Sequence, residues 1–269
     1  MTMADWGGKC WFVTGASSGF GRAIASMVLE NGGKVVATAR NPAVLDDLVA
    51  SAPGRVLATR LDIRDPLQMK QALADAEAFG GIDVLVNNAG YGFLGGVEES
   101  SDDEIEAQMD VNFFGPLRLL RAALPAMRAR GAGFIVNISS IAGVRAFAGS
   151  AFYSGSKFAL EALSEALAGE LDRFGIKVLI VEPGYFRTDF SGRSIMVAGS
   201  PHPDYGFLAR RRESALEAHG AQIGDPARGA AAILKAMNSE NPPQRLAMGS
   251  DAYGIVRDVL SSRLAELDS

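Results

Sequence analysis

Tyr153 and Lys157 are the residues of this chain whose types and spacing can move a proton. They lie four positions apart in a stretch, 152–174, whose pattern predicts a helix, so one helical turn separates them on one face. A nearby ammonium favours the phenolate and is expected to lower the pKa of the tyrosine. A phenol tuned in this way can give a proton to a carbonyl oxygen or take one from an alcohol. Such a pair is common on helix surfaces, so it predicts chemistry only together with other residues.

A glycine-rich turn, TGASSGFG at residues 14–21, follows the first apolar run and leads directly into a helical pattern. Glycines permit a tight turn and a close approach of backbone to a pyrophosphate, and a helix N-terminus supplies free N–H groups and positive dipole charge. The spacing is G-x-x-x-G-x-G rather than the commonest dinucleotide fingerprint. Its position between a strand and a helix is the context that a dinucleotide site requires.

Arg40 follows the second apolar run, where a dinucleotide site distinguishes between its cofactors. Enzymes that use NAD place an acidic residue at the end of this strand for the ribose hydroxyls. Ala39 occupies that position here, and Arg40 comes next. A guanidinium pairs well with a 2′-phosphate, and Ser17 can add a hydrogen bond. We therefore expect NADP(H) to be preferred, with NAD(H) possible; the alternative is that Arg40 is a solvated surface charge.

The composition excludes several classes of protein. Hydrophobic residues make up 48% of the 269 residues and charged residues 21%, which predicts a globular chain. The net charge of −5 argues against nucleic-acid binding, and no apolar run is long enough to cross a membrane. The two histidines, His202 and His219, have no ligands at metal-binding spacing, so no metal is expected. With Cys10 as the only cysteine and no secretory signal, we expect a cytoplasmic protein.

Short apolar runs alternate with longer helical patterns along the chain. The runs are typical of strands buried on both faces of a parallel sheet, and they cover residues 10–13, 34–38, 55–61, 83–87, 134–138, 178–181 and 245–248. The helical patterns cover residues 19–30, 42–50, 66–79, 102–130, 152–174, 226–238 and 251–267. Asp65-Pro66 and Asp225-Pro226 are typical of a helix cap followed by proline. This alternation predicts the α/β class: a single-domain, Rossmann-type, doubly wound parallel sheet of about seven strands with helices on both faces.

Residues 189–224 interrupt this alternation. A segment of this length between a strand and a helix is usually functional or mobile. We predict one dinucleotide-binding and catalytic domain over residues 1–269, in which 189–224 is a lid over the substrate. A surface insertion without function is the alternative. In the last helix, Tyr253, Val256, Leu260 and Leu264 recur at helical spacing and are expected to pack against the core.

Taken together, the motifs resemble those of a classical short-chain dehydrogenase/reductase over nearly the full chain. The matching residues occur in the family's order and at its usual spacings: TGASSGFG at 14–21, NNAG at 87–90, Asn112, NISS at 137–140, Tyr153 with Lys157, and Pro183-Gly184 with Thr188. The resemblance implies an oxidoreductase that moves a hydride between a nicotinamide and a carbonyl/alcohol pair. Each motif alone has an ordinary structural explanation, as a turn or a strand end. All of them together are hard to explain without the family.

The resemblance implies a catalytic tetrad. Tyr153 would be the acid/base, Lys157 would lower its pKa and hold the nicotinamide ribose, and Ser140, rather than Ser139, would bind the substrate oxygen. Asn112 would hold a water in the proton relay to Lys157. The implied cofactor contacts are Gly15, Ser17, Ser18, Gly19, Phe20, Gly21, Arg40, Asp62, Ile63, Asn88, Ala89, Gly90, Tyr153, Lys157, Pro183, Gly184 and Thr188.

The substrate is expected to be a small apolar ketone, aldehyde or secondary alcohol. Its candidate contacts, several of them aromatic, follow the motif ends: Tyr91, Phe93, Ala146, Phe147, Tyr185 and Phe190. In similar enzymes the helices at 102–130 and 152–174 form a subunit interface, which implies a homodimer or homotetramer. Two alternatives stay open at this point. One is an NAD(H)-dependent catabolic alcohol dehydrogenase, and the other is a non-catalytic protein that senses NADP(H).

Overall fold

The centre of the molecule is a sheet of seven parallel strands. The computed structural model describes residues 5–192, 194–217 and 219–269. Within them the strand order is β3-β2-β1-β4-β6-β7-β9, and the strands are β1 (Cys10–Val13), β2 (Lys34–Ala39), β3 (Val56–Arg60), β4 (Val84–Asn87), β6 (Gly133–Ile138), β7 (Ile176–Pro183) and β9 (Arg245–Met248). The predicted doubly wound sheet is confirmed, and every predicted strand occurs within two residues of its expected ends.

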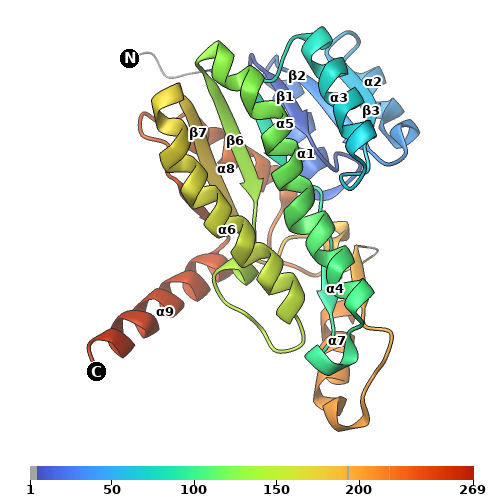
Figure 1. Cartoon of the computed structure of the whole chain (residues 1–269), viewed down its shortest axis with the longest axis vertical. Coiled ribbons are helices and arrows are strands. Elements are labelled where there is room, and N and C mark those ends of the chain that lie inside the picture. Colours follow the sequence, from blue (N-terminus) through green and yellow to red (C-terminus); the bar gives the residue numbers. More distant parts are fainter. Residues whose placement is uncertain (1–4, 193, 218) are drawn as a thin grey trace.

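Helices cover both faces of this sheet (Figure 1). On one face lie α1 (Gly19–Glu30), α2 (Asp46–Ser51) and α8 (Pro226–Met237), and on the other α3 (Pro66–Phe79), α5 (Gly115–Arg130) and α6 (Ala151–Leu171). A hydrophobic core lies on each face of the sheet. Successive residues of a strand point into opposite cores, as Phe12 and Val13 of β1 do. Strands buried on both faces must be apolar at almost every position, which is why the sequence carried so clear a signal. The Asp65 and Asp225 side chains cap α3 and α8 as predicted.

The strand order places a binding crevice at one end of the sheet. Strand β1 lies between β2 and β4, and the chain leaves β1 toward one edge and later returns to build the other. Where the order reverses in this way, the connecting loops diverge at the carboxyl ends of the strands and leave a crevice. The glycine turn follows β1, and residues 88–90 follow β4, so both motifs meet at this point.

The segment 189–224 has its own secondary structure. Its strand β8 (Ile195–Val197) pairs in parallel with β5 (Gly92–Leu94) in a separate two-stranded sheet, and α7 (Gly206–Glu217) follows. A bridge between Phe186 and Gly224 joins the two ends of the segment. Figure 1 shows α7 beyond the end of the sheet toward which the strands point. Residues 193 and 218 of this predicted lid lie outside the described residues.

The helix predicted over 102–130 is divided. It begins as α4 (Asp102–Met109), passes through a π-helical turn over Asp110–Phe114, and continues as α5. The π turn inserts an extra residue into the helical repeat, and Asn112 lies at its centre. Apolar periodicity does not indicate such a turn, because both flanking helices keep the same helical pattern.

The last helix forms as predicted, but its expected packing against the core is wrong. The helix α9 (Ser250–Leu267) forms, but Figure 1 shows it extending away from the sheet. Tyr253 is 63% exposed, Leu260 58% and Leu264 61%, and only Ala252 of this helix is buried. Periodicity identified an apolar face, but it does not say what covers that face. None of the described helices is long and apolar enough to cross a membrane.

Candidate active site

The glycine turn forms a cradle at the N-terminus of α1. Gly15 and Gly19 have positive φ values of 66° and 56°, a conformation that favours glycine. A Cβ at Gly21 would overlap the Gly15 carbonyl and the Asn88 side chain, so the turn closes only with glycine there. Ser18 precedes the helix without a side-chain cap, which leaves the first N–H groups of α1 free to bind an anion. This cradle fits the pyrophosphate of a dinucleotide.

A network of hydrogen bonds joins the glycine turn to the loop after β4. The Thr14 hydroxyl accepts hydrogen bonds from the backbone N–H groups of Asn88 and Ala89, both at 2.9 Å. The Asn88 side chain donates to the carbonyl oxygens of Thr14 at 2.8 Å and Gly15 at 3.1 Å. Two motifs about 70 residues apart in sequence therefore act as one rigid wall.

The glycine turn lines a cavity. Arg40, Asp62, Ile63 and Arg64 line the same cavity. The Asp62 carboxylate forms an ion pair with Arg64 at 2.7 Å. Hydrogen bonds from Arg64, opposed by partial burial and aided by the charge of Arg40, lower the pKa of Asp62. The backbone N–H of Asp62 is bound to the Gln68 side chain at 2.8 Å. Arg64 was not among the predicted site residues, although it directly follows the predicted cofactor contacts Asp62 and Ile63.

Tyr153 lies on α6 at the cavity wall, between Ser140 and Phe190. Burial raises the pKa of Tyr153 to about 12, and a hydrogen bond with Ser140 works in the opposite direction. The Lys157 ammonium is 6.0 Å from the centre of the Tyr153 ring. The expected lowering of the Tyr153 pKa is wrong for this structure, because loss of hydration outweighs the charge of Lys157 at that distance. Tyr153 is thus held as the neutral phenol.

Lys157 is buried on the same face of α6, one turn further on. Its ammonium donates a hydrogen bond to the Ile138 carbonyl at the end of β6, at 2.8 Å. Burial lowers the pKa of Lys157 to about 8, and the nearby Glu161 carboxylate acts in the opposite direction. The side chain is therefore fixed in position and can change charge near neutral pH.

Asn112 holds the loop that follows β4. Its side-chain oxygen accepts a hydrogen bond from the Tyr91 N–H at 3.1 Å, and its amide donates to the Tyr91 carbonyl at 3.0 Å and the Ser156 hydroxyl at 3.2 Å. The side chain is buried and is not part of the cavity lining. The π turn aims Asn112 at α6, and so connects the NNAG loop to the helix that carries Tyr153.

One cavity of about 750 Å³ brings most of the predicted residues together. Of the predicted cofactor contacts, its lining contains all except Gly21, which lies beneath the turn. Of the predicted substrate contacts, it contains Tyr91, Phe93, Phe147, Tyr185 and Phe190. Ala146 is exposed and lies outside the lining. Residues 189–224 contribute further lining that no motif indicated, chiefly Ile195, Met196, Leu208, Arg211 and Arg212.

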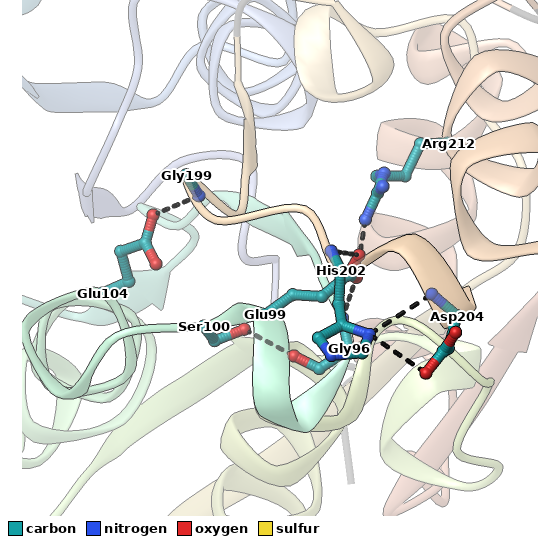
Figure 2. Close-up of polar contacts among 8 residues, drawn as sticks. All are labelled: Gly96, Glu99, Ser100, Glu104, Gly199, His202, Asp204 and Arg212. Atoms are coloured by element: carbon teal, nitrogen blue, oxygen red, sulfur yellow. Dashed lines mark hydrogen bonds and ion pairs between the residues drawn. The ribbon is translucent and has the colours of Figure 1, made fainter. Parts of the chain in front are cut away.

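Figure 2 shows two of the carboxylates that tie residues 189–224, the predicted lid segment, to the body. Glu99 is buried and accepts hydrogen bonds from the backbone of Gly96 at 2.8 Å and of His202 at 3.2 Å, and from the Arg212 guanidinium at 2.7 Å. Burial opposes its ionisation, but these bonds outweigh burial and lower the pKa of Glu99. Glu104 accepts a further bond from the backbone of Gly199 at 3.0 Å. Nothing in the sequence distinguishes Glu99 from the acidic residues beside it.

The residues after β7 close the cavity on the cofactor side. Thr188 lies over the glycine turn, where a Cβ on Gly19 would meet the Thr188 side chain at 3.3 Å. Arg187 pairs with Asp225 at 3.3 Å and donates to the Gln222 carbonyl at 2.9 Å, which fixes the end of the lid segment. Arg187 is thus engaged away from the cavity.

Comparisons with known proteins agree with this geometry. Residues 9–195 match the family model described as short chain dehydrogenase. The chain belongs to the short-chain dehydrogenase family. It is 38% identical over 259 residues to oxidoreductase BOA17 of Botryotinia fuckeliana, covering 94% of each chain. It is also 39% identical over 239 residues to a 3-ketodihydrosphingosine reductase of Bacteroides thetaiotaomicron, covering 88% of this chain and 86% of that one.

Solved structures of this short-chain dehydrogenase family show the same fold. A short-chain dehydrogenase from Streptomyces avermitilis matches with a TM-score of 0.90 at 46% identity, covering 97% of this chain and 96% of that one. A family member from Burkholderia phymatum in complex with NAD matches with a TM-score of 0.83 at 26% identity, covering 99% and 97%. Another from Burkholderia cenocepacia in complex with NADP matches with a TM-score of 0.77 at 29% identity, covering 98% and 97%. The chain is therefore an NAD(P)-dependent oxidoreductase.

Proposed function

We propose that this short-chain dehydrogenase uses NADP(H) to interconvert an apolar carbonyl compound and its secondary alcohol, with Tyr153 as the acid/base. The observation that carries the proposal is a single cavity with two chemically different ends. Tyr153, Ser140 and Lys157 gather at one end among aromatic side chains. Arg40 lies at the other end, beyond the glycine turn. A ligand that spans the cavity would meet a cation at one end and a phenol at the other.

Several residues of this chain would hold the cofactor. The backbone of the glycine turn and the N-terminus of α1 would bind the pyrophosphate, and Thr188 would close over it. Asn88, Ala89 and Gly90, which line the cavity, would flank the adjoining ribose, and Lys157 would bind the nicotinamide ribose. When bound, the nicotinamide supplies or accepts the hydride of the reaction.

The proton chemistry belongs to Tyr153 and its neighbours. In reduction, the Ser140 hydroxyl would orient the substrate oxygen, and the Tyr153 hydroxyl would give that oxygen its proton. Tyr153 starts as the neutral phenol because of its burial, which suits this direction. Lys157, held by the Ile138 carbonyl, would stabilise the phenolate that results. In oxidation the same groups act in reverse.

Arg40 supports the choice of NADP(H). Ala39 is buried at the end of β2 and offers no carboxylate to the ribose hydroxyls, whereas Arg40 is exposed beside it and lines the cavity. Asp62, a carboxylate that lines the same cavity, is already paired with Arg64. A 2′-phosphate would therefore pair with Arg40 without competing with Asp62 for the guanidinium.

The wall near Tyr153 supports an apolar substrate. Phe93 is buried, the Phe190 ring lies 5.4 Å from the Tyr153 ring, and Ile195 and Leu208 reach the cavity from the lid segment. Such a wall favours a substrate with apolar groups on both sides of its carbonyl.

The decisive experiment follows the absorbance of NADPH and NADH with a panel of carbonyl compounds, and runs the alcohol direction beside it. The panel spans aromatic ketones, steroids, small aldehydes, diketones and sugars. Turnover of apolar carbonyls with NADPH preferred is the expected result. Tight binding of NADPH without turnover in either direction would contradict the proposal and favour a cofactor-sensing protein.

The assembly and the location of the chain are part of the same proposal. The apolar side chains of α9 that face solvent, Tyr253, Leu260 and Leu264, support a homo-oligomer, because an exposed apolar row of this kind usually meets a partner. The helices α5 and α6 would carry the interface that the family resemblance implies. Cys10, the only cysteine, is buried and free, which fits the reducing environment of the cytoplasm.

A further inference from the structure

The cavity wall carries far more positive than negative charge. Asp62 is the one carboxylate among the described residues that line it, whereas five lining side chains are cationic: Arg40, Arg64, Lys157, Arg211 and Arg212. The chain as a whole has a net charge of −5, so positive charge is concentrated at this cavity. A cleft lined by charge of one sign attracts ligands of the opposite sign. The cavity therefore favours an anionic ligand.

Three of these cations belong to the cofactor site and to the reaction. Arg64 pairs with Asp62 at 2.7 Å, and Arg40 is the proposed partner of a 2′-phosphate. Lys157 takes part in the proposed proton chemistry. The remaining two cations both come from α7, in the predicted lid segment. The cofactor and the proton transfer thus leave the positive charge of α7 unused.

Two contacts fix the orientation of α7 against the cavity. Leu208 is 3% exposed, and a Cβ on Gly96 or Gly149 would meet its side chain at 3.0 or 3.1 Å. Arg212 pairs with the buried Glu99 at 2.7 Å (Figure 2). Leu208 and Arg212 are four positions apart, so they lie on one face of the helix. These two side chains determine which face of α7 lines the cavity.

Arg211 lies on this face of α7 and has no partner in the protein. It follows Leu208 by three positions and lines the cavity with it. Its guanidinium forms no ion pair or hydrogen bond within the part of the chain that the structure describes. Arg212 beside it is neutralised by Glu99. Arg211 is therefore the cation of α7 that can pair with an anionic group of a ligand.

An apolar wall connects Tyr153 with α7. The Phe190 ring lies 5.4 Å from the Tyr153 ring and packs on β5, where a Cβ on Gly92 would meet it at 2.9 Å. The three residues of β5 span about 10 Å. Just beyond the end of β5, the chain reaches Gly96 and its contact with Leu208. A ligand that extends from the phenol to α7 needs an apolar chain several carbons long.

We propose that the substrate is a long-chain oxo acid, or the corresponding hydroxy acid, whose terminal carboxylate pairs with Arg211. Its carbonyl would lie at Tyr153 and its apolar chain along β5. A single guanidinium without a partner matches a group with one negative charge and offers it two parallel N–H donors, which favours a carboxylate over a phosphate. The proposal deepens the proposed function, and rests on it because the carbonyl must react at Tyr153.

The first test compares oxo acids with their methyl esters. Straight-chain methyl-ketone carboxylic acids of increasing chain length are assayed with NADPH, each beside its methyl ester, which lacks the charge. At the chain length that spans the wall, wild type should prefer the acid by about 10-fold in kcat/KM, as expected for hydrogen bonds to a charged group. Equal kcat/KM for acid and ester at every chain length would overturn the proposal.

Arg211→Ala removes the cation, and Arg210→Ala is the matched control. Arg210 precedes Arg211 on α7 and is also exposed, but it is not part of the cavity lining. The preference for the acid should disappear in Arg211→Ala and persist in Arg210→Ala. Arg211→Lys should retain part of it, because an ammonium keeps the charge but not the paired N–H donors. A preference that survives in Arg211→Ala, or that both alanine variants lose equally, would contradict the role of Arg211.

A binding measurement without turnover separates this proposal from the proposed function. Titration calorimetry in the presence of NADP⁺ uses a straight-chain alkanoate, its methyl ester and the alkyl phosphate of equal length. The alkanoate should bind about 10-fold more tightly to wild type than to Arg211→Ala, and the ester should not distinguish them.

If this difference is found in an enzyme that reduces no carbonyl, the proposed function fails and the carboxylate site stands. Equal affinity of wild type and Arg211→Ala for the alkanoate rejects the site whatever the activity. Tighter binding of the alkyl phosphate than of the alkanoate, lost in Arg211→Ala, would overturn the assignment of a carboxylate.

Discussion

Single residues in this enzyme are governed by a competition between burial and charge. At Tyr153 burial dominates and raises the pKa to about 12, whereas at Lys157 burial lowers the pKa to about 8. The two changes have one cause, since each buried group prefers its neutral form. A neutral phenol beside a lysine that can change charge near neutral pH is a suitable resting state for a proton donor.

Replacing Tyr153 with Phe should remove the proton donor and leave the cavity nearly unchanged. General acid catalysis is worth about 10²–10⁴-fold, so kcat should fall by at least about 10²-fold. The dissociation constant of NADPH, measured by fluorescence, should stay close to the wild-type value. Tyr253→Phe on the exposed face of α9 is the control. A Tyr153→Phe enzyme that retains most of its kcat would show that another group donates the proton.

Replacing Arg40 with Ala should change the choice of cofactor. A hydrogen bond to a charged group contributes about 1.5–3 kcal/mol, so the NADPH dissociation constant should rise by about 10- to 100-fold while that of NADH stays nearly constant. Titration calorimetry with both cofactors measures this. Arg60→Ala, at the end of the neighbouring strand β3 and outside the cavity lining, serves as the control. Equal affinity for NADPH in wild type and Arg40→Ala would refute the role of Arg40 in binding the 2′-phosphate.

The buried Glu161 should also make folding stability depend on pH. Its pKa is raised from 4.5 to about 7 in the folded state, so its favourable contribution is present at low pH and is lost as pH rises through 7. Relative to Glu161→Gln, wild type should lose about 2 kcal/mol of unfolding free energy between pH 5 and pH 7.5. Urea denaturation at the two pH values measures the difference. A constant gap between the two proteins would mean that Glu161 keeps one charge state throughout.

At the scale of the elements, two irregular features build the site. The π turn over Asp110–Phe114 directs Asn112 toward α6, and the lid segment adds β8 to β5 and brings Leu208 of α7 into the cavity. Both depend on contacts between distant segments. Glu99 supplies two of these contacts, to the backbone N–H of His202 and to the side chain of Arg212.

Replacing Glu99 with Gln should loosen the lid. The change removes the negative charge opposite Arg212, and breaking one side of a buried ion pair costs about 3–5 kcal/mol. The local cost should open the lid rather than unfold the sheet, so KM should rise by at least about 10-fold, and limited proteolysis within 194–217 should become faster. Glu106→Gln on the exposed face of α4 is the control. Unchanged KM and unchanged proteolysis would show that the lid is held by other contacts.

At the scale of the whole molecule, the strand order of the sheet determines where the cofactor crevice lies. The helix α9, in contrast, has a row of apolar side chains that are exposed to solvent. The crevice lies where the strand order reverses between β2 and β4 around β1. The helix α9 stands away from this body (Figure 1), and its exposed leucines contribute nothing to the two cores.

Changing Leu260 and Leu264 to Glu should separate the subunits of the proposed oligomer. Both side chains are exposed in the single chain, so the stability of the monomer should change by no more than about 0.5 kcal/mol per substitution. Light scattering should show an oligomer for wild type and a monomer for the double variant. An unchanged mass would place the interface elsewhere, on α5 and α6 for example, and a monomeric wild type would reject the oligomer.

The sequence by itself determined the frame of this protein. Strands buried on both faces carry unbroken apolar runs, and Asp65 and Asp225 mark helix starts through purely local hydrogen bonds, so these elements were predictable. The glycine turn was predictable for the same reason, because Gly15 and Gly19 are required by local backbone conformation. Most of the predicted cofactor contacts then line one cavity, because the carboxyl ends of parallel strands meet at one edge of the sheet.

Only the tertiary structure decided the features that depend on what lies opposite a residue. The apolar face of α9 has the same periodicity as a buried helix, but no residue that the structure describes covers it. The pKa of Tyr153 is raised because the side chain is buried, and the spacing between Tyr153 and Lys157 does not reveal that burial. The burial of Glu99 and Glu161 likewise depends on distant partners, Arg212 and Arg245, that the fold brings to them. Local pattern encodes local conformation, whereas desolvation and pairing arise only when the chain has folded.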